Sequence, residues 1–204
     1  MVGLVIFDVD NVLVRYDRSR RVAVLAERLG RTADEVTAAV FGSGIEDAAD
    51  AGELGPDEYL QAIGERLGTP VPRDVWVEAR VAATVADPAM VALVADVAAR
   101  TTVALLTNNG RLHREEFARI APEVAAIPGV RLFASGDLRR AKPDPEVYRT
   151  VAAHHGVAPA DALFVDDSPD YVEGACRAGL RAHHYTDRDG LVAFLAAEGL
   201  DVSP

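Results

Sequence analysis

The chain has 204 residues, half of them hydrophobic, which is enough to bury the core of one domain with a modest insertion. Its net charge of −11 leaves no surplus of basic residues for a nucleic-acid surface, so we expect no nucleic-acid partner. The single cysteine, Cys176, excludes an internal disulfide framework, and no apolar run approaches the ~20 residues of a membrane span. We therefore expect a cytoplasmic protein without a membrane partner, in which Cys176 packs as a small apolar side chain.

Apolar, β-rich segments recur along the chain and are separated by helical patterns. Strands are predicted at residues 2–9, 102–107, 130–135, 162–166 and 181–186. Strands that alternate with helices form parallel sheets. The sequence therefore predicts an α/β fold, with a Rossmann-like parallel sheet core and helices on both of its faces.

The gap between the first two strands is much longer than the others and contains only helical patterns. A first helix is predicted at residues 19–30, and a second begins at the capping box formed by Thr32 and Glu35. A third is predicted from Pro56 to Gly68 and a fourth from Pro72 to about Thr84. We therefore expect residues 15–86 to be an inserted, small α-helical cap domain. Residues 1–14 and 87–204 then form the core domain. A helix at residues 88–100 leads the chain from the insertion back to the sheet.

Two carboxylates, Asp8 and Asp10, follow the first apolar run directly. Side chains alternate along a strand, so both leave it on the same side. Burying two like charges costs several kcal/mol unless a cation neutralises them. A hard divalent ion such as Mg²⁺ is the usual solution, and it commonly brings a phosphate with it.

Polar side chains also follow the next three strands. Thr107 and Asn108 end the second, Lys142 lies a short distance after the third, and Asp166 and Asp167 end the fourth. Each feature alone is typical of a turn, a solvated lysine or a helix start. Ligands of parallel sheets gather at the carboxyl ends of the strands, so the combination in this order predicts a phosphate-binding site.

These segments, Asp8-Val9-Asp10-Asn11-Val12, Thr107, Lys142-Pro143 and Asp166-Asp167, resemble the motifs of the haloacid dehalogenase (HAD) superfamily, over nearly the whole chain. The helical insertion after the first motif resembles the helical C1-type cap of subfamily I. Residues 107–113 and 142–148 look closest to the sugar-phosphatase branch that includes glucose-1-phosphate phosphatases.

The resemblance implies roles for these residues. Asp8 would be the nucleophile that forms an aspartyl-phosphate, and Asp10 the general acid and base. Thr107, Asn108 and Lys142 would bind the phosphate, Lys142 as a point charge and Asn108 through its backbone N–H. Mg²⁺ would be bound by Asp8, Asp167 and the backbone carbonyl of Asp10, with Asp166 as a further ligand or holding a metal-bound water.

Two positions depart from the superfamily pattern, in which glycine is most common at the position of Asn11 and threonine at that of Val12. Val12 is a known alternative. Asparagine tolerates unusual backbone angles better than most residues, so we expect the turn after Asp10 to be preserved.

The resemblance implies a Mg²⁺-dependent phosphatase that acts on a small phosphorylated metabolite, such as a sugar phosphate. A 2-haloacid dehalogenase, a phosphomutase and a non-catalytic binding protein are alternatives on the same fold. The oligomeric state stays open between a monomer and a homodimer. Candidates for substrate selection are Arg15, Tyr16, Asp17, Phe41, Ser43 and Glu46, and Arg111 and His113 are interpreted either as the rim of the site or as an exposed helix start.

Overall fold

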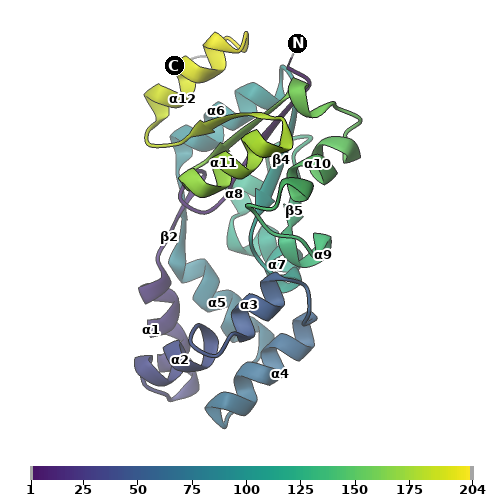
Figure 1. Ribbon diagram of the computed structural model, residues 1–204. Helices are drawn as coiled ribbons and strands as arrows, with labels where there is room; N and C mark the ends of the chain where they lie inside the picture. Colours follow the sequence, from purple (N-terminus) through teal and green to yellow (C-terminus); the bar gives the residue numbers. More distant parts are fainter. Residues whose placement is uncertain (1, 203–204) are drawn as a thin grey trace.

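The structure, a computed structural model, describes residues 2–202 and contains a parallel sheet with a group of helices beyond one end of its strands (Figure 1). The sheet has five strands in the order β5-β4-β1-β6-β7, and all neighbouring pairs are parallel. The strands are β1 (Leu4–Phe7), β4 (Thr102–Thr107), β5 (Arg131–Ala134), β6 (Ala162–Asp166) and β7 (Arg181–His184). The predicted α/β fold with a parallel sheet core is therefore confirmed.

The central strand β1 is buried on both faces, which explains its uninterrupted apolar sequence. Val5 and Phe7 contribute to one core cluster, and Leu4 and Ile6 to another on the opposite face. The first face is covered by α6 (Pro88–Ala98), α7 (Arg111–Ile120), α8 (Pro122–Ala125) and α12 (Arg188–Ala197). The second is covered by α10 (Pro145–His154) and α11 (Pro169–Ala178).

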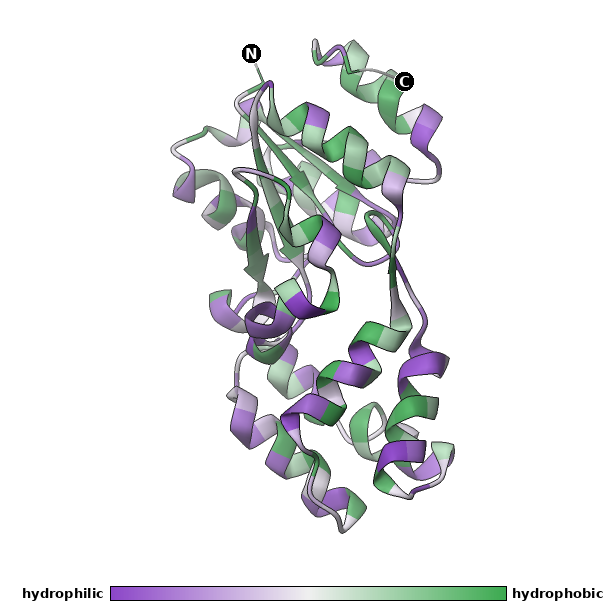
Figure 2. Cartoon of the chain, turned by 180° about the vertical axis from the view of Figure 1, so that it is seen from behind, coloured by the Kyte–Doolittle hydropathy of each residue, from purple (hydrophilic) through white to green (hydrophobic). Residues whose placement is uncertain are grey.

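In the sequence between β1 and β4, a group of helices forms a hydrophobic core of its own. It consists of α1 (Arg18–Leu29), α2 (Ala33–Val40), α3 (Ile45–Asp50), α4 (Pro56–Leu67) and α5 (Arg73–Ala83), called the helical insertion below. Thr32 and Glu35 form the predicted capping box of α2, and Trp76 is buried at the centre. Hydrophobic and hydrophilic residues alternate along these helices, whereas the central sheet strands β1, β4 and β6 are mostly hydrophobic (Figure 2).

The expectation that the long gap holds only helices is wrong. Two strands, β2 (Val14–Tyr16) and β3 (Thr84–Ala86), pair antiparallel where the chain enters and leaves the helical insertion. With 3 residues each, they are too short to produce a periodic pattern. The predicted domain boundaries, 14/15 and 86/87, fall at this strand pair, and the division into two domains stays a prediction.

Other local expectations also need correction. The third predicted strand ends at Ala134, because Ser135 already begins the short helix α9 (Ser135–Leu138). Cys176 is exposed on α11, so its expected packing is wrong, and Ala175 and Ala178 face the sheet instead. A short 3-10 helix, η1 (Pro159–Asp161), precedes β6. Across residues 2–202, no helix is both long enough and apolar enough to cross a membrane.

Candidate active site

At the carboxyl ends of the central strands, Lys142 forms two buried ion pairs. Its Nζ lies 2.7 Å from Oδ1 of Asp8, directly after β1, and 2.6 Å from Oδ2 of Asp166, the last residue of β6. The lysine is only 3% exposed. Its Nζ also lies 4.8 Å from the centre of the Tyr171 ring, which covers it from α11. Three residues that are distant in the sequence therefore form one buried, charged cluster, as the sequence predicts.

The cluster contains two acidic side chains and only one basic side chain. Burial, opposed by Lys142 and reinforced by Asp166, raises the pKa of Asp8 to about 7. Burial also raises the pKa of Asp166. Burial alone would lower the pKa of Lys142, but the two neighbouring carboxylates outweigh it and raise that pKa. One ammonium is thus shared between two buried acids, an arrangement that a further bound cation would stabilise.

Asp8, Asp166 and Asp167 have carboxylate oxygens that all lie within 4.8 Å of one another. An all-oxygen donor set of this kind suits a hard cation such as Mg²⁺. The Asp10 side chain is not part of this oxygen cluster, consistent with the backbone carbonyl as its expected contact. The backbone N–H of Ser168 donates to Oδ1 of Asp166 at 2.8 Å, which fixes that carboxylate beside the lysine.

The Asn108 side chain holds the backbone of Lys142. Its Oδ1 accepts from the Lys142 N–H at 3.0 Å, and its Nδ2 donates to the Lys142 carbonyl at 2.9 Å. From the sequence, only the backbone N–H of Asn108 was expected to have a role, in binding the phosphate. The loop that contains Lys142 and Pro143 also packs closely on α11. A Cβ on Gly174 of this helix would lie only 2.5 Å from the Pro143 carbonyl oxygen. Glycine at position 174 therefore allows the loop to bring Lys142 to the sheet.

Asn109 links the second strand end to the first. Its Nδ2 donates to Oγ1 of Thr107 at 2.7 Å and to Oδ2 of Asp10 at 3.2 Å. Oδ1 of Asp10 is buried and has no hydrogen-bond partner among residues 2–202. Asn11 has a φ of 64°, so the expected unusual backbone conformation after Asp10 is present. Asn109 thus holds one oxygen of Asp10, and the other is left without a partner in the described part of the chain.

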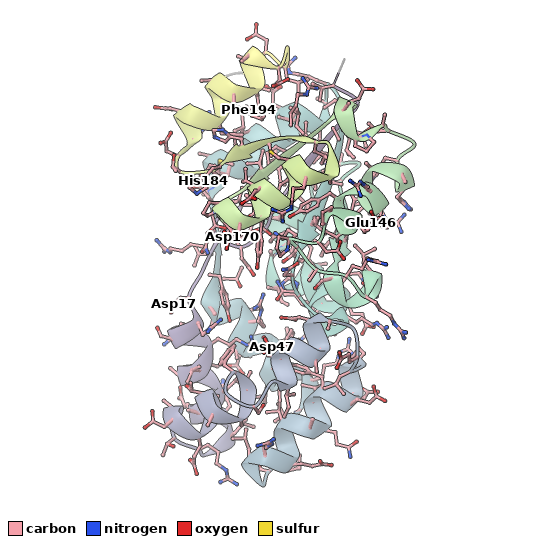
Figure 3. All side chains as sticks on the ribbon, viewed as in Figure 1. Asp17, Asp47, Glu146, Asp170, His184 and Phe194 are labelled. Atoms are coloured by element: carbon pink, nitrogen blue, oxygen red, sulfur yellow. The ribbon has the colours of Figure 1, made fainter. Side chains whose placement is uncertain are left out.

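A cavity of about 390 Å³ opens beside these residues, a volume suited to a small metabolite. The sheet side contributes Asp8, Asp10, Thr107, Asn108, Lys142 and Asp167 to its wall. The helical insertion contributes Arg18, Phe41, Glu46, Asp47, Asp50 and Arg80, and Tyr16 of β2 lies between the two sides. Figure 3 labels Asp47 on α3, at the end of the insertion that faces the sheet.

The candidates for substrate selection divide into two groups. Tyr16, Phe41 and Glu46 line the cavity, whereas Arg15, Asp17 and Ser43 are not among its lining residues. Asp17 instead caps α1 by accepting from the Arg20 N–H. Arg111 and His113 line a smaller neighbouring cavity. His113 is buried, so the interpretation of this segment as an exposed helix start is wrong for His113.

Sequence reasoning missed several residues of the cavity wall, above all Arg18, Asp50 and Arg80. In the sequence they are charged residues within amphipathic helices, where solvent exposure is the usual outcome. Only the arrangement of α1, α3 and α5 in the folded molecule brings these residues to the cavity that Asp10 also lines. Asn109 and Tyr171 were also missed, although Asn109 directly follows the two predicted residues of its strand end.

The comparisons with known proteins agree with this geometry. A family model described as haloacid dehalogenase-like hydrolase matches residues 2–179. A phosphatase of Mycobacterium tuberculosis is 38% identical over 103 residues, which are 48% of this chain and 46% of the relative. Flavin mononucleotide hydrolase 1, a chloroplast protein of Arabidopsis thaliana, is 38% identical over 71 residues, or 35% of this chain and 29% of the relative. The matches thus span less than half the length of these relatives.

Among solved structures, a HAD family enzyme from Bacteroides thetaiotaomicron, crystallised with magnesium and inorganic phosphate, has the same fold. The TM-score is 0.77 at 20% sequence identity, and the match covers 94% of this chain and 99% of the other. The family match, which extends over most of the chain, and the shared fold lead to one conclusion. The chain belongs to the haloacid dehalogenase-like hydrolase family.

Proposed function

We propose that the protein is a Mg²⁺-dependent phosphatase that hydrolyses a small phosphorylated metabolite through an aspartyl-phosphate on Asp8. The observation that carries this proposal is the contact of Lys142 with both Asp8 and Asp166, beside Asp167 and Thr107 in one cavity wall. A phosphate monoester is dianionic and repels an anionic nucleophile, so its hydrolysis requires clustered positive charge. Lys142 supplies part of that charge.

In this mechanism the Asp8 carboxylate attacks phosphorus, and the bond to the leaving alcohol breaks. Asp10 gives its proton to the leaving oxygen and then removes a proton from the water that hydrolyses the aspartyl-phosphate. The unpartnered Oδ1 of Asp10 is free for this exchange, while Asn109 holds the other oxygen. The Lys142 ammonium, the Thr107 hydroxyl and the backbone N–H groups after Thr107 bind the phosphoryl oxygens.

Mg²⁺ fits the donor set of this site. Asp8, Asp166 and Asp167 are oxygen donors close enough to share one ion, and the single lysine leaves their charge incompletely neutralised. When bound, the ion supplies charge neutralisation and orientation of the phosphate. The two matched relatives named as a phosphatase and as a flavin mononucleotide hydrolase support a phosphate ester as the substrate class.

Phosphate release from p-nitrophenyl phosphate tests the proposal. We expect turnover with Mg²⁺, its loss in EDTA, and a decrease of roughly 10³-fold or more in Asp8→Asn, as for removal of a catalytic nucleophile. Asp170→Asn, an exposed acid at the start of α11, is the control and keeps the wild-type rate. Turnover that persists without metal, or in Asp8→Asn, contradicts the proposal.

A 2-haloacid dehalogenase is the alternative that needs the nucleophile but no metal. The cluster of Asp166 and Asp167 beside Asp8 has no role in that reaction, which favours the phosphatase. Halide release from 2-haloacids, measured with a halide electrode in EDTA, distinguishes the two activities. A phosphomutase would use the same residues as the phosphatase, and a coupled isomerase assay on sugar phosphates tests it.

A further inference from the structure

Arg80 of α5 is a buried cation in the wall of the cavity. Its side chain is 2% exposed and lines the cavity next to the proposed acid–base residue, with Nη2 3.8 Å from Oδ2 of Asp10. Neither Nε nor Nη2 forms a hydrogen bond within residues 2–202. The guanidinium lies over the Tyr16 ring at 4.5 Å from its centre, and this contact fixes its position on the cavity wall.

The acids around Arg80 are engaged elsewhere. Glu46 is paired with Arg21 at 2.6 Å and also accepts from the Tyr59 hydroxyl. Burial, reinforced by Glu46, raises the pKa of Asp50 to about 8, so Asp50 is mostly neutral at pH 7. Asp10 accepts from Asn109 and lies beyond hydrogen-bonding distance of Arg80. The 3.8 Å ion pair with Asp10 therefore compensates only part of the desolvation cost of this buried guanidinium.

A second arginine faces the same cavity from α1. Arg18 is exposed and lies over the Phe41 ring, with its guanidinium carbon 4.5 Å from the ring centre. It forms no ion pair with a carboxylate in the described part of the chain. Its neighbour Arg21, in contrast, donates to Glu46 through both of its Nη atoms. The leaving-group side of the cavity thus presents two arginines, one buried and one exposed, whose guanidinium groups are available to an anion.

We propose that Arg80, assisted by Arg18, binds an acidic group of the leaving alcohol and thereby selects phosphorylated hydroxy acids. This inference rests on the proposed phosphatase function. Asp10 protonates the oxygen of the leaving alcohol, and Arg80 lies directly beside Asp10. The acidic group is therefore attached within the first few atoms of that oxygen. Carboxylates and phosphates match the planar fork of a guanidinium, which donates two parallel hydrogen bonds to them.

Two pairs of substrates that differ only in this group test the proposal. They are 2-phosphoglycerate with glycerol 2-phosphate, and 3-phosphoglycerate with glycerol 3-phosphate. In each pair a carboxylate is exchanged for a hydroxymethyl group. Phosphate release with Mg²⁺ gives kcat/KM for wild type, Arg80→Gln, Arg80→Lys and the control Arg66→Gln. Arg66 is an exposed arginine of α4 outside the cavity.

We expect wild type to prefer the acidic member of at least one pair by roughly 10- to 100-fold, the range of one charge-assisted hydrogen bond. Arg80→Gln abolishes this preference, Arg80→Lys retains part of it, and Arg66→Gln keeps it. The proposal is overturned if wild type shows no preference, or if the preference survives in Arg80→Gln. It is also overturned if Arg80→Gln slows both members equally, because Arg80 would then act only by positioning Asp10.

Binding to an inactive protein separates this proposal from the phosphatase function. Asp8→Asn and Asp8→Asn/Arg80→Lys are titrated calorimetrically with both members of each pair in the presence of Mg²⁺. Tighter binding of the acidic member, weakened by the Arg80 change, supports the role of Arg80 even if no phosphate is released by wild type. Equal binding of both members to Asp8→Asn overturns it. The conservative Arg80→Lys change also carries the test if Arg80→Gln fails to fold.

Discussion

The Asn108 side chain forms hydrogen bonds with both backbone polar groups of Lys142 and thereby fixes the lysine that contacts Asp8 and Asp166. Asn108 directly follows β4, whereas Lys142 lies in the loop after α9. An asparagine amide has the donor and the acceptor that such a contact requires. The residue that follows β4, Asn108, therefore determines the position of the Lys142 ammonium.

Replacing Asn108 with alanine is expected to displace Lys142. The change leaves a buried N–H and carbonyl of the loop without partners, which costs about 1–3 kcal/mol of unfolding free energy. We also expect kcat/KM for phosphate release to fall roughly 10- to 100-fold, since a shift of Lys142 by a fraction of an ångström weakens charge stabilisation. Urea unfolding and phosphate release measure the two effects. A variant with wild-type kcat/KM would contradict the positioning role of Asn108.

Replacing Arg21 with methionine is expected to destabilise the helical insertion. Arg21 pairs with Glu46 through both of its Nη atoms, so the change leaves the Glu46 carboxylate without this cation, at a cost of about 3–5 kcal/mol. In the double variant Arg21→Met/Glu46→Leu the unpaired charge is gone, and part of the stability returns. Urea unfolding of both single variants and the double variant measures the coupling. Strictly additive losses would show that the ion pair is unimportant.

Gly136 lies where α9, after strand β5, comes close to α3 of the helical insertion. A Cβ at this position would lie 2.9 Å from the Gly110 Cα and 3.0 Å from the carbonyl oxygen of Ala49 on α3. We expect Gly136→Ala to cost about 1–3 kcal/mol, as overpacking usually does, and to raise KM by separating α3 from the cavity. Gly55→Ala is the control, because its Cβ would meet only the flexible Glu58 side chain. Equal effects of the two changes on KM would contradict this explanation.

His113 makes stability depend on pH. Burial, reinforced by Arg80 and Arg21, lowers the pKa of His113 well below 6.5. The unfolded chain therefore takes up a proton below about pH 6.5 that the folded protein does not. The contribution of His113 to the unfolding free energy therefore falls as the pH falls, by about 1.4 kcal/mol per unit below that value. Above it His113 makes no pH-dependent contribution.

Urea unfolding between pH 7.5 and 5 checks this dependence. The pKa values of His155 and His183 are also lowered by burial and contribute with the same sign. The raised pKa values of Asp8 and Asp50 contribute with the opposite sign in this range. The difference between wild type and His113→Gln isolates the share of His113. A wild-type slope that is unchanged in His113→Gln would show that this residue does not cause the pH dependence.

The sequence by itself determined the sheet and the proposed reacting groups. Asp8 and Asp10 follow a buried strand at a spacing of two, and Asp166 ends another apolar run, so strand periodicity alone predicts that they share one edge. The capping box at Thr32 and the positive φ of Asn11 are likewise local properties. Such features depend on the nearest few residues and can be read without knowledge of distant contacts.

Only the tertiary structure decided the wall opposite these groups. Arg80 is an ordinary charged residue of an amphipathic helix in the sequence, yet it is buried beside Asp10. Asn108 was expected to act through its backbone, but its side chain holds Lys142. The 3-residue strands β2 and β3 also escaped prediction. The physical reason is that burial and pairing of these residues depend on how separate elements pack, and helical or strand periodicity carries no information about that packing.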